Sequence, residues 1–154
     1  MALLLDTGIL YAYYDRSDAW HAAAAELVAG EPGELLVPAP VLPEVDHLLG
    51  VRLGRAAREL FYRGLAQASY LVVELPQERI ARVAEIDRQF AELDLGFVDA
   101  AIVALAEALG IARIATSDRR HFEPLARAFK LELLPAPPAS ARARRARAAA
   151  GSRK

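Results

Sequence analysis

Four acidic side chains interrupt apolar segments of the sequence, and they are the residues best suited to chemistry. They are Asp6, Glu44, Asp99 and Asp118, and each ends or lies within a largely apolar stretch. Burying several carboxylates together is costly, because each loses hydration and they repel one another. A divalent cation relieves both costs, and carboxylate oxygens suit Mg²⁺ or Mn²⁺. The sequence therefore predicts a metal site, whose ion can activate water and stabilise charge on a phosphoryl group.

Each of these acids also has an explanation that needs no metal. Asp6 and Asp118 could cap the helix or turn that follows them. Asp99 could be a first-turn acid favoured by the helix dipole, and Glu44 could lie on an exposed helix face. The metal hypothesis therefore depends on the four acids together. Asp94 is a further acid close before Asp99, and we interpret it as a solvated loop residue.

The three histidines invite a metal or acid–base role, but their positions do not support one. No pair of them has the spacing of a zinc site, and we expect no catalytic histidine. His47 lies about one helical turn after Glu44 and could orient its carboxylate without taking part in chemistry.

Strand-like and helix-like segments alternate along the chain and must position these acids. The predicted strands are 2–5, 35–37, 70–75, 111–115 and 130–134, and the predicted helices are 7–14, 18–28, 41–53, 55–67, 78–93, 97–109 and 123–128, with Asp18 as the N-cap of the second helix. Continuously apolar strands indicate a mainly parallel sheet covered on both faces, which is a three-layer α/β/α sandwich. Sites in such folds form beyond the carboxyl ends of strands, where Asp6 and Asp118 lie.

Length and composition favour one domain with an unusual distribution of charge. The chain has 154 residues, and its lack of cysteine excludes disulfides, zinc–thiolate sites and cysteine nucleophiles. From Arg142 onward the chain has six basic residues and no acidic one. The residues before Arg142 comprise 13 basic and 20 acidic side chains, so this part of the chain has a net charge of −7. The N-terminus lacks a basic leader, and the weakly charged stretch 97–112 is too short and too acidic to span a bilayer. We therefore expect a cytoplasmic protein with no membrane association.

Four segments carry the acids in a fixed order. They are Leu4-Leu5-Asp6-Thr7, Val41-Leu42-Pro43-Glu44-Val45, Gly96-Phe97-Val98-Asp99-Ala100-Ala101 and Ile114-Ala115-Thr116-Ser117-Asp118-Arg119-Arg120-His121-Phe122. In order, spacing and total length, over about residues 2–135, the sequence resembles PIN-domain proteins, closest to VapC-type toxins of prokaryotic toxin–antitoxin pairs. The resemblance implies a PIN-like fold and a Mg²⁺-dependent endoribonuclease, in which Mn²⁺ may substitute. It also implies a homodimer that a cognate antitoxin keeps silent.

The resemblance assigns roles to these acids position by position. Asp6 and Asp99 would be the principal metal ligands, and Glu44 would complete the site directly or through water. Asp118 would bind a second metal or orient water. All four would therefore form the catalytic site. Residues 1–135 would form the PIN-like nuclease domain, followed by a Pro/Ala/Arg-rich basic tail, 136–154, which we expect to be disordered.

Smaller features of the motifs add to this picture. Thr7 and Thr116 match small hydroxyl residues that border the family's pocket and could hold an acid or a water. Arg119 and Arg120 could bind RNA phosphates, although a solvated basic loop explains them equally well. Gly8 departs from the family, which usually has serine or alanine there, and we expect this to affect only the start of the helix.

Three rival functions were weighed against the nuclease. A phosphatase of the haloacid-dehalogenase type needs a second aspartate where Gly8 stands. A response-regulator receiver domain needs a lysine at a late strand end, and Lys130 and Lys154 fit poorly. The serious alternative is a PIN-like module that binds nucleic acid or a partner without cutting, and the presence of all four acids argues against it.

Overall fold

A parallel sheet forms the centre of the molecule. The computed structural model describes residues 1–139 and 141, so most of the predicted tail, 136–154, lies outside the described residues. Within the described part, five strands make up the sheet: β1 (Leu3–Leu5), β2 (Leu35–Pro38), β3 (Leu71–Val73), β4 (Arg113–Ala115) and β5 (Glu132–Leu134). Every neighbouring pair is parallel.

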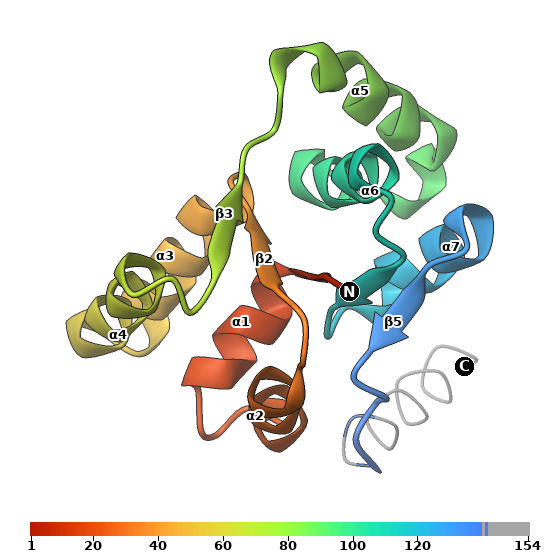
Figure 1. Cartoon of the computed structure of the whole chain (residues 1–154). Coiled ribbons are helices and arrows are strands. Elements are labelled where there is room, and N and C mark those ends of the chain that lie inside the picture. The colour runs from red at the N-terminus through yellow and green to blue at the C-terminus, as the bar shows by residue number, and fades with distance from the viewer. Residues whose placement is uncertain (140, 142–154) are drawn as a thin grey trace.

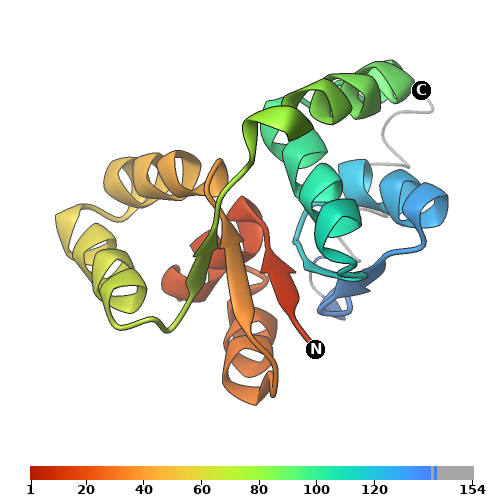
Figure 2. The same ribbon diagram turned by 45° about the horizontal axis from the view of Figure 1, so that its top comes forward.

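Helices cover both faces of this sheet. They are α1 (Thr7–Tyr14), α2 (His21–Gly30), α3 (Val41–Arg52), α4 (Arg55–Ala66), α5 (Ile80–Gln89), α6 (Phe97–Leu109) and α7 (Arg119–Phe129), with short 3-10 helices η1 (Gln77–Arg79) and η2 (Ala91–Leu93). Figures 1 and 2 show α1 to α4 on one side of the sheet and α5 to α7 on the other. The predicted three-layer α/β/α sandwich is confirmed. None of the helices in the described residues is long and apolar enough to cross a membrane.

The strand order places a crevice beside the central strand. The order is β3-β2-β1-β4-β5, so the chain builds outward from β1 through β2 to β3 and then returns to the other side of β1. Right-handed crossovers that run to the two sides of β1 put their helices on opposite faces of the sheet, so the two groups of helices separate between β1 and β4. Parallel α/β proteins bind ligands at this point, beyond the carboxyl ends of the strands. Asp6 follows β1 there, and Thr116 follows β4.

The buried core explains why these elements hold their positions. All three residues of β1 are fully buried, as expected for a central strand covered by helices on both faces. Helix α6 is buried continuously from Ala100 to Ala106 and packs against α5 and α7. It ends at Gly110, whose φ of 65° is the left-handed conformation that favours glycine after a helix.

Two predicted helices differ from the structure for local reasons. The segment predicted as one helix, 78–93, is divided into η1, α5 and η2, because the backbone leaves the helical region at Phe90, whose ring packs against that of Phe129. The second helix begins at His21 instead of Asp18, since the Asp18 side chain accepts a hydrogen bond from the Trp20 backbone N–H and stabilises the turn before the helix.

Candidate metal centre

Asp6 is held at the end of β1 by two hydrogen bonds. Its Oδ1 accepts from the Thr7 backbone N–H at 2.7 Å and its Oδ2 accepts from the Thr116 hydroxyl at 2.7 Å. Asp6 is the N-cap of α1, so the capping role considered from sequence is present. Only 4% of the residue is exposed. Burial raises the pKa of Asp6 to about 7, and the neighbouring Asp99 charge adds to the rise.

Asp99 lies in the first turn of α6 and meets a histidine from α7. Its Oδ2 is 2.7 Å from Nδ1 of His121. Burial raises the pKa of Asp99 to about 6 although the His121 hydrogen bond opposes the rise, and the charges of Asp118 and Glu44 add to it. An ionised carboxylate only accepts hydrogen bonds, so the proton shared in this contact lies on Nδ1 whenever Asp99 is charged.

Asp118 closes the cluster from the start of α7. Its backbone N–H donates to the Thr116 hydroxyl at 2.9 Å, and its Oδ1 accepts from the His121 backbone N–H at 3.1 Å, which makes it the N-cap of the helix. Its other oxygen, Oδ2, lies 3.2 Å from His121 Nδ1. One ligand atom each from Asp99, Asp118 and His121 therefore lies within 4.8 Å of the others.

Glu44 approaches the same site from the first turn of α3. It is exposed, and its Oε2 accepts a hydrogen bond from the Thr7 hydroxyl at 2.7 Å. Thr7 and Thr116 thus each hold an acid, as the sequence suggested they could. The hydrogen bond that orients Glu44 comes from Thr7, and none joins it to His47 among the described residues. Asp94 is exposed in a left-handed turn with φ 52°, consistent with a loop acid.

His121 is the member of the cluster that the sequence interpretation missed. It lies three residues after the capping Asp118, a spacing that brings its backbone N–H to the cap and its ring back over the helix start. That spacing was visible in the sequence. Its contact with Asp99 was not, because it depends on how α6 packs against α7.

The two arginines after Asp118 have different environments. Arg119 is 7% exposed, its guanidinium lies over the Trp20 ring at 5.6 Å, and it donates to the carbonyl oxygens of Leu133 and Pro135. Two of its guanidinium nitrogens therefore contact the fold itself, and the binding of RNA phosphates by Arg119 stays a prediction. Arg120 is exposed. Both belong to α7 and not to a loop, since the Asp118 cap starts that helix earlier than predicted.

The donor set fits a divalent ion. Asp6 is a buried carboxylate and Asp99 a half-buried one, and the pKa values of both are raised, which means that the site disfavours their negative charges unless a cation is present. The carboxylate oxygens gathered at the site suit Mg²⁺ or Mn²⁺, and His121 Nδ1 lies against Asp99 and Asp118 as their hydrogen-bond partner. Asp6, Asp99 and Asp118 would hold the ion, with Glu44 at the exposed side.

A family model and a curated protein match most of the chain. The PIN domain model matches residues 3–128, which include all four acids. The chain is also similar to Ribonuclease VapC26 of Mycobacterium tuberculosis, with 32% identity over 123 residues that cover 80% of this chain and 91% of that protein.

Solved structures with the same fold include known toxins. VapC20 of Mycobacterium tuberculosis, described as a Sarcin-Ricin loop cleaving toxin, matches with a TM-score of 0.71 and 24% identity, covering 79% of this chain and 94% of that one. A toxin–antitoxin complex from Klebsiella pneumoniae matches with a TM-score of 0.59 and 19% identity, covering 78% and 89% of the respective chains. At these identities the two structures support the fold.

Proposed function

This chain belongs to the PIN-domain family, and on that basis we propose that it is a metal-dependent endoribonuclease that hydrolyses phosphodiester bonds of RNA. The observation that carries the proposal is the pair of carboxylates Asp6, which is buried, and Asp99, which is half-buried; they are close enough for the Asp99 charge to raise the pKa of Asp6. Similarity to a curated ribonuclease supports RNA as the substrate.

The side chains divide the work of the site between holding the ion and orienting water. Asp6, Asp99 and Asp118 would hold the divalent ion, which would supply the charge that activates water and stabilises the phosphoryl group. The Thr116 hydroxyl fixes Asp6 by donating to its Oδ2. The Thr7 hydroxyl fixes Glu44 at Oε2 and leaves Oε1 to accept a proton from the attacking water.

His121 keeps two of the ligands together when no ion is bound. Its Nδ1 lies within hydrogen-bonding distance of both Asp99 and Asp118, so the repulsion between these carboxylates is reduced. The cluster is in this way organised before metal binding, and less reorganisation is needed when the ion arrives. His121 is a positioning residue in this proposal.

The biological setting follows from the relatives. We infer that the chain is the toxin of a type II toxin–antitoxin pair, inhibited by a cognate antitoxin protein, because the fold is shared with a toxin and with a toxin–antitoxin complex. Cellular RNA as substrate puts its activity in the cytoplasm. The exposed apolar side chains of Leu71 and Val72 on edge strand β3, and of Phe97 beside the site, are consistent with a homodimer.

The decisive experiment compares RNA cleavage by matched aspartate variants. Wild-type protein should cleave RNA with Mg²⁺ or Mn²⁺ and lose this activity in EDTA. Asp6→Asn and Asp99→Asn should abolish cleavage with circular dichroism unchanged, whereas Asp94→Asn, an exposed acid outside the cluster, should cleave normally. Full activity in both cluster variants would refute the metal site. Metal binding without cleavage of any RNA would favour the non-catalytic module.

A further inference from the structure

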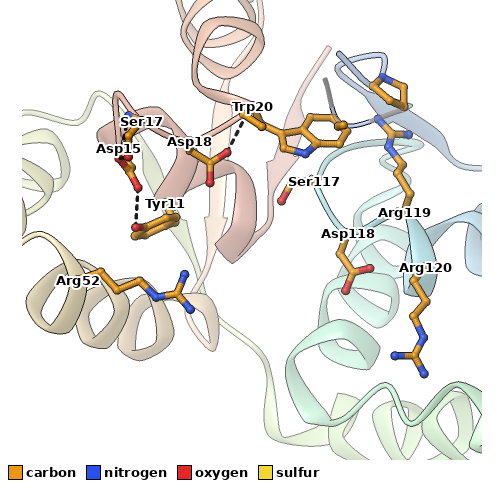
Figure 3. Close-up of a pocket in the computed structure, with 13 residues that line it drawn as sticks. Tyr11, Asp15, Ser17, Asp18, Trp20, Arg52, Ser117, Asp118, Arg119 and Arg120 are labelled. Atoms are coloured by element: carbon orange, nitrogen blue, oxygen red, sulfur yellow. Dashed lines mark hydrogen bonds between the residues drawn. The ribbon is translucent and has the colours of Figure 1, made fainter. Parts of the chain in front are cut away.

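A cavity of about 480 Å³ opens directly beside the acid cluster and shares Asp118 with it. Figure 3 shows its walls, which come from α1, the turn before α2, α3, the start of α7 and the chain after β5. The volume lies within the range of small-molecule sites. An RNA strand whose scissile phosphate lies at Asp118 would bring an adjacent nucleotide to this cavity.

One wall of the cavity is an aromatic surface of fixed orientation. The indole of Trp20 lines the cavity and is packed against the Arg119 guanidinium, 5.6 Å from the ring centroid. Arg119 is itself tied to the carbonyls of Leu133 and Pro135, and the Trp20 backbone is tied to Asp18. A preorganised aromatic ring suits an unpaired base, since stacking contributes about 1–3 kcal/mol for each base.

Two arginines line the same cavity and have no carboxylate partner within residues 1–139 and 141. Arg52 lies over the Tyr11 ring, 5.3 Å from its centroid, and Arg120 extends from α7 beside Asp118 (Figure 3). Both are exposed. Guanidinium groups of this kind bind the phosphates of nucleic acids.

The acids of the cavity do not contradict a bound nucleotide. The Asp15 carboxylate is occupied by the Tyr11 hydroxyl and by Ser17, which lowers its pKa. Asp18 uses Oδ1 for the Trp20 backbone and keeps Oδ2 as an acceptor beside the indole. An acceptor at this position can bind an exocyclic amino group, which adenine, guanine and cytosine carry and uracil lacks.

We propose that this cavity is a nucleotide subsite, in which Trp20 stacks an unpaired base of the RNA next to the cleaved bond while Arg52 and Arg120 bind its phosphates. Asp18 gives the subsite a preference for bases with an amino group. The inference rests on the proposed function for the identity of the strand. It goes beyond that function by naming the residues that select single-stranded over duplex RNA.

The test uses Trp20 itself, because it is the one tryptophan in the sequence. Nucleoside 5′-monophosphates have a base and a phosphate but no phosphodiester bond to cut. Titration of AMP, in Mg²⁺, should quench Trp20 fluorescence saturably, whereas UMP should bind more weakly and inorganic phosphate should leave the fluorescence unchanged. If AMP, GMP and CMP all fail to quench Trp20 fluorescence, the proposed subsite is overturned.

A second arm distinguishes an RNA strand from a free nucleotide. On Asp6→Asn protein, a short single-stranded oligoribonucleotide should quench Trp20 at concentrations at least about tenfold lower than AMP, and a duplex of the same sequence should not. Equal affinity for AMP and the oligonucleotide would assign the cavity to free nucleotides and overturn the strand assignment. RNA cleavage without Trp20 quenching would refute the subsite and leave the nuclease intact.

The arginine contacts have their own matched control. Arg52→Ala and Arg120→Ala should each lower oligonucleotide affinity about tenfold and reduce the slope of log affinity against log salt by about 0.7. Arg127→Ala removes an exposed arginine from the same helix as Arg120 but outside the cavity, and it should change neither quantity. Equal effects of Arg120→Ala and Arg127→Ala would mean that Arg120 acts only through its charge, and they would overturn its assignment to the cavity.

Discussion

Replacing Asp6 by asparagine should make the metal-free protein more stable at alkaline pH. The pKa of Asp6 rises from its ordinary value of 3.8 to about 7 in the fold, so the folded state holds this proton more tightly than the unfolded chain. The resulting stability is complete below about pH 4 and is lost as the pH rises through about 7. At 1.36 kcal/mol for each pKa unit, the ionised Asp6 costs the metal-free fold about 4 kcal/mol.

The asparagine variant isolates this effect because it preserves the local geometry. Its side-chain oxygen can still accept from the Thr7 N–H, and its amide can donate to the Thr116 hydroxyl, which has a second lone pair besides the one used by Asp118. Between pH 5 and pH 8, in EDTA, the free energy of unfolding of the wild type should fall by about 3 kcal/mol more than that of Asp6→Asn.

Urea denaturation followed by circular dichroism at the two pH values measures the difference. Millimolar Mn²⁺ at pH 8 should restore stability to the wild type and not to Asp6→Asn, because a ligand stabilises the state that binds it. Equal losses of stability in the wild type and the variant between pH 5 and pH 8 would refute the argument that the buried charge of Asp6 is the unfavourable element.

Three further changes test other parts of the site. His121→Ala removes the hydrogen bond that lowers the pKa of Asp99, so the pKa of Asp99 should rise further. The affinity for Mn²⁺, measured by calorimetry, should therefore weaken more at pH 6 than at pH 8. An unchanged pH profile would contradict this. Gly8→Ala would place a Cβ 2.3 Å from the Ser117 hydroxyl, so this variant should not raise the melting temperature. In a Ser117→Ala background the nearest contact is 3.6 Å, and Gly8→Ala should then stabilise the helix by about 1 kcal/mol. Equal effects of Gly8→Ala in the two backgrounds would count against the clash. Deleting residues 140–154 should reduce the salt dependence of RNA binding, and an unchanged slope would assign the basic tail another role.

The fold was predictable wherever local chemistry fixes an element. Helix α6 has the predicted bounds, because Gly96 and Gly110 flank an apolar run that can only be buried. The order of apolar strands and helices was enough to indicate a parallel sandwich. The break at Phe90 was not predictable, because it depends on a ring from α7.

The residues of the site were likewise predictable only where local sequence determines their position. Asp6 and Asp118 were found because they follow strands, a position that the topology turns into a crevice. The surroundings of His121 and Arg119 were not predictable, because residues far away in sequence provide them: His121 meets Asp99 from α6, and Arg119 is buried against Trp20 and the chain after β5. Gly8 also proved to matter beyond the start of its helix, since its missing side chain leaves room for a hydroxyl from the β4–α7 connection.

The hydrogen bond from Thr116 to Asp6 joins residues that are 110 positions apart. The four acids lie at the end of β1, in α3, in α6 and at the start of α7, so a growing chain on the ribosome lacks a complete cluster until α7 has emerged. Pairing β1 with β4 also closes a long loop, which slows this step relative to local helix formation. Completion of the acid cluster is thereby separated in time from the start of synthesis, and a fragment that ends before α7 lacks His121.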